Sequence, residues 1–434
     1  MSADAEVLVP SKRTGLYIGA AVAAVIPGLV VHLGGIEVKP LAAACIFGIA
    51  VVGAAFMLAW GAEAAQVDIS AGLAIALLAL VAVLPEYAVD FVFTWKAGKD
   101  PAEYAPKALA NMTGGNQLLI GAGWSMVVLV AAYRIRQVRK GRLNAPAKMV
   151  RYDDVDGVQL SRSHSVEIAF LVIATVYGLT LPMHSTITLI DAVVLVTIFV
   201  LYIVRVARAP AEEPHLVGPA LKIGMMPDRP RRLAVGALFL GAVIAILLCA
   251  EPFADSLVET GHQFNIDDFL LISLVAPLAS EAPEFLVAGL FAWRLQTDQG
   301  LGALVSSKVN QWTLLVGTLP IVFAISSQSL HGLPIDGVQR EELFVTAAQS
   351  AFAVAILANR SINVKEALTL LGVFLVQLVT KLPAFESIHA EARITVGVLY
   401  LVMAAVIIIR NRKAFPPLMK DGLRTPMTEL AEAD

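Results

Sequence analysis

The stretch LPEYAV at residues 84–89 recurs as APEFLV at residues 282–287, and each copy places a glutamate directly after a proline within an apolar run. A charged carboxylate at the centre of a lipid bilayer costs roughly 2.5 to 3.5 kcal/mol on insertion scales. Glu86 and Glu284 hold matching points of two such copies. They are therefore predicted to be functional residues of a membrane protein.

A second pair of stretches follows the first in both halves of the chain. TGGNQLLIGAG at residues 113–123 aligns without a gap with SKVNQWTLLVG at residues 307–317. Each begins with a hydroxyl side chain and carries an Asn-Gln pair. The chain is thus predicted to contain an internal duplication.

The composition indicates a polytopic membrane protein. The 434 residues are 58% hydrophobic and 15% charged, and their mean hydropathy is +0.75. A soluble protein of this length is less apolar. The formal net charge of −3 implies neither nucleic acid nor an acidic substrate as a partner.

About twelve apolar spans are predicted from the length that a helix needs to cross a bilayer. They cover residues 15–34, 38–62, 71–96, 108–133, 165–183, 187–206, 232–252, 268–294, 301–326, 341–358, 364–382 and 392–411. The expected fold class is an all-α membrane protein.

Basic residues outside the spans predict the orientation of the chain. Clusters of Lys and Arg lie at residues 134–151 and 208–232, and others lie near the two ends, at 12–13 and 410–424. The positive-inside rule places all of them on one side, so both termini are expected in the cytoplasm. The plasma membrane is the expected location, because no transit peptide is evident.

The number of spans predicts how the two copies are related. Glu86 and Glu284 lie on spans that are five apart, and an odd number of helices per repeat inverts the second copy. The expected domains are an N-terminal tail with one extra helix, a first five-helix repeat, a cytoplasmic linker, an inverted second repeat, and one extra helix with a cytoplasmic tail. Their boundaries are 1–37, 38–206, 207–231, 232–382 and 383–434.

A proline beside a carboxylate predicts a cluster of oxygen ligands. Proline has no backbone N–H, so Pro283 should release the carbonyl of Ala279. In a membrane such a carbonyl needs another helix, water or a bound ion. Together with carboxylates, hydroxyls and amides it makes an all-oxygen cage suited to a hard cation such as calcium. No histidine or cysteine joins the motif, which argues against zinc or copper.

The paired Pro-Glu stretches with their trailing Asn-Gln stretches resemble the repeats of the calcium/cation antiporter superfamily, whose domain is the sodium/calcium exchanger membrane region. The resemblance implies that Glu86 and Glu284 are the central metal ligands. It implies further cation ligands at the positions of the family's serine and of its following Asn or Asp, namely Thr113, Ser307, Gln117 and Gln311.

The chain departs from the family pattern beside both prolines. The family has two hydroxyl residues there, whereas the first repeat has Ala82 and Val83. The second repeat has Ser280 and Glu281, which adds a carboxylate to the predicted cation ligands. Lys308 stands where the family has asparagine, and we expect it to pair with Glu281. Such a pair would neutralise a charge otherwise balanced by sodium, so proton coupling is an alternative to sodium coupling.

The sequence allows two interpretations for each of several polar residues. Asp90 lies one turn after Glu86 and is either an accessory of the site or part of an aqueous entrance. Thr113 and Ser307 alternatively donate to their own helix backbones. Asn116 and Asn310 are possible accessories, but adjacent positions on a helix point in different directions, so they alternatively serve helix contacts.

The predicted function is secondary active antiport, not enzymatic catalysis. The chain is expected to exchange Ca²⁺ for Na⁺ or H⁺ by alternating access, without a cofactor and with inorganic cations and the lipid bilayer as its partners. An antiporter of Na⁺ or another cation against H⁺ is the nearest alternative. From another class, a non-transporting membrane scaffold with degenerate exchanger repeats remains open. No visible motif encodes the oligomeric state.

Overall fold

The computed structural model describes residues 14–68, 84–141, 157–209, 216, 218–264 and 268–432, and these residues are mostly helical. Ten helical segments within this part of the chain are long and apolar enough to cross a membrane. They are α1 (Thr14–Leu33), α2 (Pro40–Ala65), α5–η1–α6 (Pro101–Leu118, Leu119–Trp124, Ser125–Arg139), α7 with η3 (Ser165–Gly178, Leu181–Met183), α8 (Leu189–Val206), α10 (Asp228–Phe264), α11 (Asp268–Trp293), α12–η4–α13 (Thr297–Asn310, Gln311–Leu315, Val316–Ser327), α14 with η5 (Gly337–Ile356, Leu357–Asn359) and α16 (His389–Arg410).

Two further helices match predicted spans but are shorter. They are α4 (Leu84–Ala97) and α15 (Val364–Thr380). The first half of the predicted span 71–96 lies outside the described residues, as do Ala82 and Val83. α9 (Gly218–Gly224) and the first turn of α10 lie within the stretch 207–231 that was predicted to be a linker. The remaining elements are η6 (Pro383–Ile388), α17 (Phe415–Leu423), α18 (Met427–Glu432), β1 (Gly157–Gln159), β2 (Thr186–Ile187), β3 (Leu333–Pro334) and β4 (Ser361–Asn363).

The same order of elements occurs twice along the chain. A helix (α2 or α10) precedes the Pro-Glu helix (α4 or α11), and a long helix with a π-helical segment in its middle follows (α5–η1–α6 or α12–η4–α13). Each half then continues with a helix, a short strand and a last helix (α7–β2–α8 or α14–β4–α15). π-Helical segments are rare and concentrate at functional sites.

Matching residues begin the last helix of each half. Thr188 caps α8 by accepting a hydrogen bond from the backbone N–H of Asp191, and the Asp191 carboxylate accepts from the backbone N–H of Thr188. Asn363 and Glu366 make the same reciprocal pair at the start of α15. These capping boxes satisfy backbone donors that a helix start otherwise leaves unpaired.

The short strands join the two halves. β1 pairs antiparallel with β4, so that Val158 lies opposite Ile362. β2 pairs antiparallel with β3, so that Ile187 lies opposite Leu333. Each pair thus takes one strand from each half, and the two halves are connected at both ends of α7 and α14.

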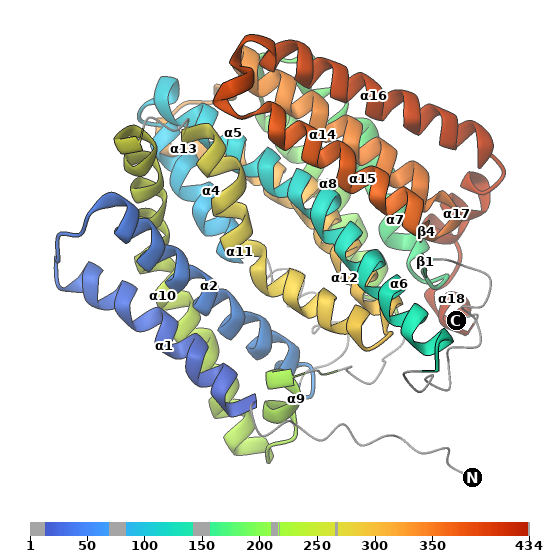
Figure 1. Ribbon diagram of the computed structural model, residues 1–434, viewed down its shortest axis with the longest axis horizontal. Helices are drawn as coiled ribbons and strands as arrows, with labels where there is room; N and C mark the ends of the chain where they lie inside the picture. The colour runs from blue at the N-terminus through green and yellow to red at the C-terminus, as the bar shows by residue number, and fades with distance from the viewer. Residues whose placement is uncertain are drawn as a thin grey trace.

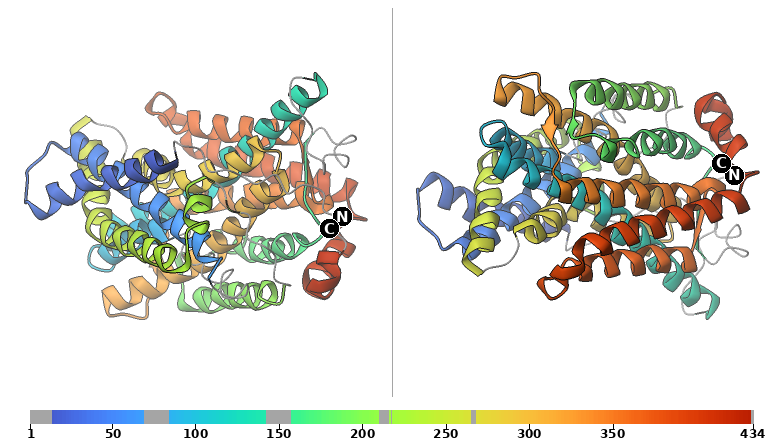
Figure 2. Two further views of the ribbon diagram at one scale, coloured as in Figure 1. Left: turned by 90° about the horizontal axis from the view of Figure 1, so that it is seen from below. Right: turned by 90° about the horizontal axis from the view of Figure 1, so that it is seen from above.

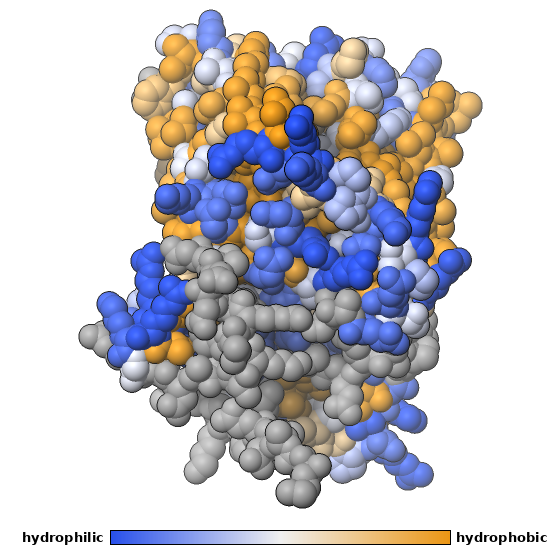
Figure 3. Space-filling view, turned by 90° about the vertical axis from the view of Figure 1, so that its right-hand side faces the viewer, coloured by the Kyte–Doolittle hydropathy of each residue, from blue (hydrophilic) through white to orange (hydrophobic). Residues whose placement is uncertain are grey.

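The helices form a bundle with two outer groups and a set of helices between them. α1, α2 and α10 pack side by side along one side of the molecule, as Figures 1 and 2 show. α14, α15 and α16 lie on the opposite side, and α4, α5, α11 and α12 lie between the two groups (Figure 1). The end that carries β1, β4 and α17 has many hydrophilic side chains, with hydrophobic ones along its upper part (Figure 3).

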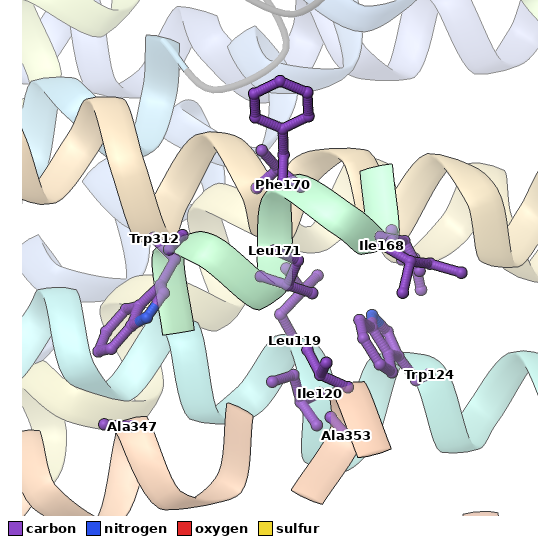
Figure 4. Close-up of a cluster of buried hydrophobic side chains, with 14 of the residues drawn as sticks. Leu119, Ile120, Trp124, Ile168, Phe170, Leu171, Trp312, Ala347 and Ala353 are labelled. Carbon is purple, nitrogen blue, oxygen red and sulfur yellow. The ribbon is translucent and has the colours of Figure 1, made fainter. Parts of the chain in front are cut away.

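Apolar side chains pack around the two π-helical segments. Leu119 of η1 lies against Leu171 of α7, and Trp124 and Trp312, one from each π-helical segment, flank this contact in Figure 4. Both tryptophans are at most 1% exposed. This core fixes the middle of α5–η1–α6 and of α12–η4–α13, which carry the polar stretches identified in the sequence.

Candidate cation site

The Pro-Glu helices lie on either side of α5. α5 packs against both α4 and α11. Pro85 lies in α4, and the residues before Leu84 are outside the part of the chain that the structure describes. Pro283 is inside α11, so the carbonyl of Ala279 loses its usual partner four residues on. The Pro-Glu helix of the second repeat thus carries a carbonyl without its intrahelical partner close to Glu284.

Three polar side chains form the centre of the site. The amide nitrogen Nε2 of Gln311 donates to Oε2 of Glu86 and to Oε1 of Glu281, both at 2.9 Å. Glu86 is 3% exposed, Glu281 is 2% exposed and Gln311 is fully buried. One amide therefore bridges carboxylates from α4 and α11. Glu86, Glu281 and Gln311, which the sequence analysis named as cation ligands, thus lie together.

Glu284 lies at the edge of this centre. Its Oε2 accepts a hydrogen bond from Oγ of Ser307 at 2.7 Å. Both residues are half-buried, in contrast to Glu86 and Glu281. The charges of Glu284 and Glu86 interact electrostatically. The Ser307 hydroxyl thus donates to a carboxylate of the motif, and its role as a cation ligand stays a prediction.

Gly115 of α5 brings the backbone close to both buried carboxylates. A Cβ atom on Gly115 would lie 2.9 Å from Oε1 of Glu281 and 3.1 Å from Oε1 of Glu86. The preceding Gly114 packs against α11, where a Cβ would lie 1.9 Å from the carbonyl oxygen of Ser273. The glycine pair therefore allows α5 to touch α11 and leaves room between the two carboxylates.

The two hydroxyls predicted to be ligands beside Gly115 and Glu281 bind their own helices. Oγ1 of Thr113 donates to the carbonyl oxygens of Leu109 and Ala110 at 2.8 and 3.3 Å. Oγ of Ser280 donates to the carbonyl oxygens of Ala276 and Pro277, both at 3.2 Å. Such back-bonding is common for hydroxyls in membrane helices. Because both hydroxyl protons are donated to the backbone, only the lone pairs of the two hydroxyl oxygens are left to bind a cation.

Asp90 is buried one turn after Glu86. Its Oδ1 accepts a hydrogen bond from Nδ2 of Asn111 at 2.9 Å, and the residue is fully buried. A residue that lines an aqueous entrance would be exposed, so the accessory interpretation fits better. Asn111 was not predicted from the sequence, because nothing in the second repeat repeats this pair.

The predicted ion pair between Lys308 and Glu281 is not formed. Nζ of Lys308 donates instead to Oδ1 of Asn116 at 2.5 Å and to its backbone oxygen at 3.3 Å. The ammonium lies 4.6 Å from the centre of the Trp312 ring. Lys308 is fully buried, and its partner Asn116 directly follows Gly115, the residue that approaches both carboxylates.

Gln117 joins a different cluster. Its Nε2 donates to Oε2 of Glu342 at 3.0 Å and to Oγ1 of Thr346 at 2.8 Å, and both of these residues are on α14. The expectation that Gln117 ligates a cation beside Glu86 is therefore not met by its contacts. Asn310 accepts a hydrogen bond from the Tyr87 hydroxyl at 3.0 Å, so it serves a helix contact between α12 and α4.

Unpartnered oxygens show where a cation fits. Oε1 of Glu86, Oε2 of Glu281 and Oε1 of Gln311 are buried and accept no hydrogen bond. Buried acceptors without a donor are costly, and a cation would satisfy them. Among the described residues, however, no three Asp, Glu, His or Cys side chains are arranged to hold a metal ion. The N–H groups of Gln311 face both carboxylates, so the amide has to turn or move before Ca²⁺ can bind between them. Amide, hydroxyl or carbonyl oxygens have to complete the set of ligands.

The comparisons with known proteins show which family the chain belongs to. The family model described as sodium/calcium exchanger protein matches residues 39–207 and 235–382. The chain belongs to the sodium/calcium exchanger family. Members of this family exchange inorganic cations across lipid bilayers, so the chain is an integral membrane antiporter.

Solved structures of family relatives share this fold. The crystal structure of the H⁺/Ca²⁺ exchanger CAX is 37% identical to the chain, covers 98% of it with 100% of its own length, and superimposes with a TM-score of 0.84. The structure of native YfkE is 13% identical, covers 84% of the chain with 99% of its own length and has a TM-score of 0.60, which shows the fold alone. No curated protein sequence matches the chain.

Proposed function

We propose that this exchanger moves Ca²⁺ against H⁺ by alternating access, with Glu86, Glu281 and Glu284 as the carboxylates that bind the cation. The observation that carries the proposal is the bridge from Gln311 to Glu86 and Glu281, which joins the two Pro-Glu helices through one side chain of α12–η4–α13. Glu284 and Ser307, which are both half-buried, complete the polar groups of the proposed site.

The predicted arrangement of twelve spans in two inverted repeats is part of this proposal. The repeated order of elements and the pairing of one strand from each half support it. The two stretches matched by the family model, 39–207 and 235–382, support repeats at 38–206 and 232–382. Five spans per repeat would give the halves opposite orientations and place both termini in the cytoplasm, with the plasma membrane as the location.

The burial of the carboxylates would make the exchange obligatory. An uncompensated charge is costly in a low-dielectric interior, and Glu86 and Glu281 lie next to each other there. The site can change sides when a divalent cation or protons neutralise these carboxylates. A doubly charged, unoccupied site would not change sides, because burying its two carboxylates without a cation would cost several kcal/mol per charge.

One observation favours protons over sodium as the counter-ion. CAX, the relative at 37% identity, is described as an H⁺/Ca²⁺ exchanger. Sodium as the counter-ion is the alternative that the experiment below separates.

The test is Ca²⁺ uptake into sealed liposomes that contain the purified protein. An outward proton gradient and an outward sodium gradient are applied separately, and Glu86→Gln and Glu284→Gln are compared with the wild type. Glu391→Gln is the matched control, because Glu391 is an exposed carboxylate on α16. We expect uptake with the proton gradient alone, and losses of at least about 100-fold in the two site variants but none in the control. Uptake driven by sodium alone would overturn proton coupling, and no uptake in either gradient would overturn calcium exchange.

A further inference from the structure

Polar side chains spaced four residues apart run along two neighbouring helices, α4 and α5. Residues at this spacing lie on the same face of a helix. α4 and α5 pack against each other (Figure 1). The six side chains, called the polar row below, are Glu86, Asp90 and Thr94 of α4 and Asn111, Lys107 and Glu103 of α5.

The polar row extends from the candidate cation site to the surface. One turn after Glu86, Oδ1 of Asp90 accepts a hydrogen bond from Nδ2 of Asn111 at 2.9 Å. At the far end of the row, Nζ of Lys107 is 3.1 Å from Oε1 of Glu103. The side chains of this ion pair are 9% and 47% exposed. The row therefore begins at a buried carboxylate and ends at one that water reaches.

Three neighbouring oxygens in the middle of the row make no hydrogen bond within the protein. They are Oδ2 of Asp90, Oγ1 of Thr94 and Oδ1 of Asn111, and each belongs to a residue that is at most 1% exposed. Buried polar atoms of this kind are usually hydrogen-bonded to buried water. The three residues thus provide a route of hydrogen bonds through a part of the molecule that is otherwise apolar.

The second half of the chain has no such row. Alignment of the Pro-Glu helices, and of the helices that follow them, places four fully buried apolar residues opposite the polar ones. Ala288, Ala292, Val305 and Leu301 stand at the positions of Asp90, Thr94, Asn111 and Lys107. The second half packs α11 against α12 without polar groups at these positions. Packing of the helix pair therefore does not require the polar row.

The chemistry of the row suits protons better than Ca²⁺. A divalent cation on this route would meet the ammonium group of Lys107, and like charges repel strongly in a low-dielectric interior. It would also have to pass closely packed helices, because Asp90 and Thr94 are fully buried. A proton moves by exchange between hydrogen-bonded oxygens and needs no wide passage.

Charged groups on the other helices around α4 leave Asp90 to the row. Among the described residues, none of them forms a hydrogen bond or an ion pair with Asp90, and α13 carries no charged side chain. Those closest to α4 are Glu63 of α2, Glu281 and Glu284 of α11, and Glu251 and Asp255 of α10, of which the last two bind Lys96 at the end of α4.

We propose that the polar row carries protons between the surface and Glu86, with Asp90 as the residue that binds the proton on the way. This inference rests on the proposed exchange against H⁺. A proton from water binds a carboxylate oxygen of Asp90 and forms an O–H bond. It then passes through buried water to the carboxylate of Glu86, and Asp90 is a carboxylate again. In the proposed orientation the exposed end of the row lies outside the cytoplasm.

The test compares two modes of transport in the same sealed liposomes. Ca²⁺ uptake driven by an outward proton gradient requires protons to leave the site, whereas exchange of radioactive Ca²⁺ for unlabelled Ca²⁺ inside the liposomes requires none. Asp90→Asn keeps the acceptor for Asn111 and removes the group that binds a proton. We expect the proton-driven rate to fall at least about tenfold, and the Ca²⁺/Ca²⁺ rate to stay within about twofold of the wild type. Asp90→Glu should restore most of the proton-driven rate.

A second variant and a matched control accompany Asp90→Asn. Asn111→Val introduces the residue that the second half has at the matching position, Val305, and interrupts the row while Asp90 remains. We expect the same selective loss of proton-driven uptake. The control is Asp191→Asn, because Asp191 is a 2% exposed carboxylate on α8, outside the row. Its ratio of the two rates should equal that of the wild type.

The outcomes separate this inference from the proposed function. Absence of proton-driven uptake in the wild type would overturn the exchange against H⁺ and the proton route with it. If the wild type shows this uptake, an unchanged ratio of the two rates in Asp90→Asn overturns the proton route alone. An equal loss of both modes would also contradict it, since a cation ligand or a structural residue behaves in that way. If Asp90→Asn does not fold, the ratio in Asn111→Val decides.

Discussion

Gln117 and Gln311 hold matching positions in the two halves of the chain, yet their amides bind different partners. Gln311 donates to Glu86 and Glu281 at the meeting point of the Pro-Glu helices. Gln117 donates to Glu342 and Thr346 of α14. The duplicated sequence thus produces one glutamine in the candidate cation site and one that holds α5 to α14.

This difference predicts different effects of the same substitution. Gln311→Ala removes an amide that holds two buried carboxylates, and we expect the apparent affinity for Ca²⁺ to change by about tenfold, which corresponds to one hydrogen bond to a charged group. Gln117→Ala should lower the unfolding temperature and leave the affinity within about twofold. Liposome uptake at varied Ca²⁺ and thermal unfolding separate the two effects. Equal changes of affinity in both variants would contradict the assignment.

The hydroxyls of Ser307 and Thr113 give a second matched pair. Ser307→Ala removes the donor to Glu284, so we expect cation affinity to fall by about three- to tenfold. Thr113→Val keeps the shape of the side chain and removes only a hydrogen bond to its own helix, so affinity should stay within about twofold. The measurement is the Ca²⁺ concentration at half-maximal uptake. A larger effect of Thr113→Val than of Ser307→Ala would show that the threonine ligates the ion.

Adjacent glycines of α5 should respond differently to alanine. Gly114→Ala forces a Cβ into the backbone of Ser273, which cannot yield, so we expect a loss of stability of about 3 kcal/mol or more. Gly115→Ala meets only the ends of the Glu281 and Glu86 side chains, which can move. This variant should fold and lose most of its Ca²⁺ uptake. Yield after purification and liposome transport check the pair, and normal uptake by Gly115→Ala would contradict the position of the site.

The buried charge of Lys308 should oppose cation binding. Lys308→Met keeps the length of the side chain and removes the buried amino group that binds Asn116, next to the glycine that approaches Glu281 and Glu86. We expect Ca²⁺ to bind at least about tenfold more tightly, because a like charge has been removed from a low-dielectric site. Asn116→Ala is the control, since it removes the partner of the ammonium group but keeps the charge. Binding is measured by the Ca²⁺ dependence of thermal unfolding. Weaker binding by Lys308→Met would contradict the prediction that Lys308 opposes cation binding.

The C-terminal segment should loosen in acid. Arg162 binds Asp421 of α17 through two hydrogen bonds of 2.7 and 2.8 Å, and this guanidinium holds the pKa of the Asp421 carboxyl below its ordinary value. A lowered pKa in the folded state stabilises the contact above the ordinary value of about 3.9. This contribution is lost as the pH falls through the lowered pKa.

A spin label can follow this segment. The label is placed on Thr428→Cys, on the exposed side of α18, after Cys45 and Cys249 have been replaced by serine. We expect an immobile label at pH 7 that becomes mobile only when the pH falls well below the ordinary carboxyl pKa of about 3.9. With Asp421→Asn the label should be mobile at both pH values. A label that stays immobile in this variant would show that other contacts hold the segment.

Most of the class and much of the site could be predicted from the sequence. Apolar length alone indicates membrane helices, and the duplicated Pro-Glu stretches single out Glu86 and Glu284, because an unpaired carboxylate is too costly in a membrane to be placed twice without a function. Glu281 and Gln311 could also be predicted, since they lie within the same two motifs. These features are local in the chain, so they are visible in the linear order of residues.

The tertiary structure decided which polar groups meet. Asn116 and Gln117 are neighbours in sequence but point in different directions from α5, so one meets Lys308 and the other meets Glu342. The partners of Gln117 come from residues more than two hundred positions away, and no repeat of the motif marks them. Hydrogen bonds between helices depend on how the helices rotate and pack against one another. That rotation is set by the whole apolar core, and a short motif does not contain it.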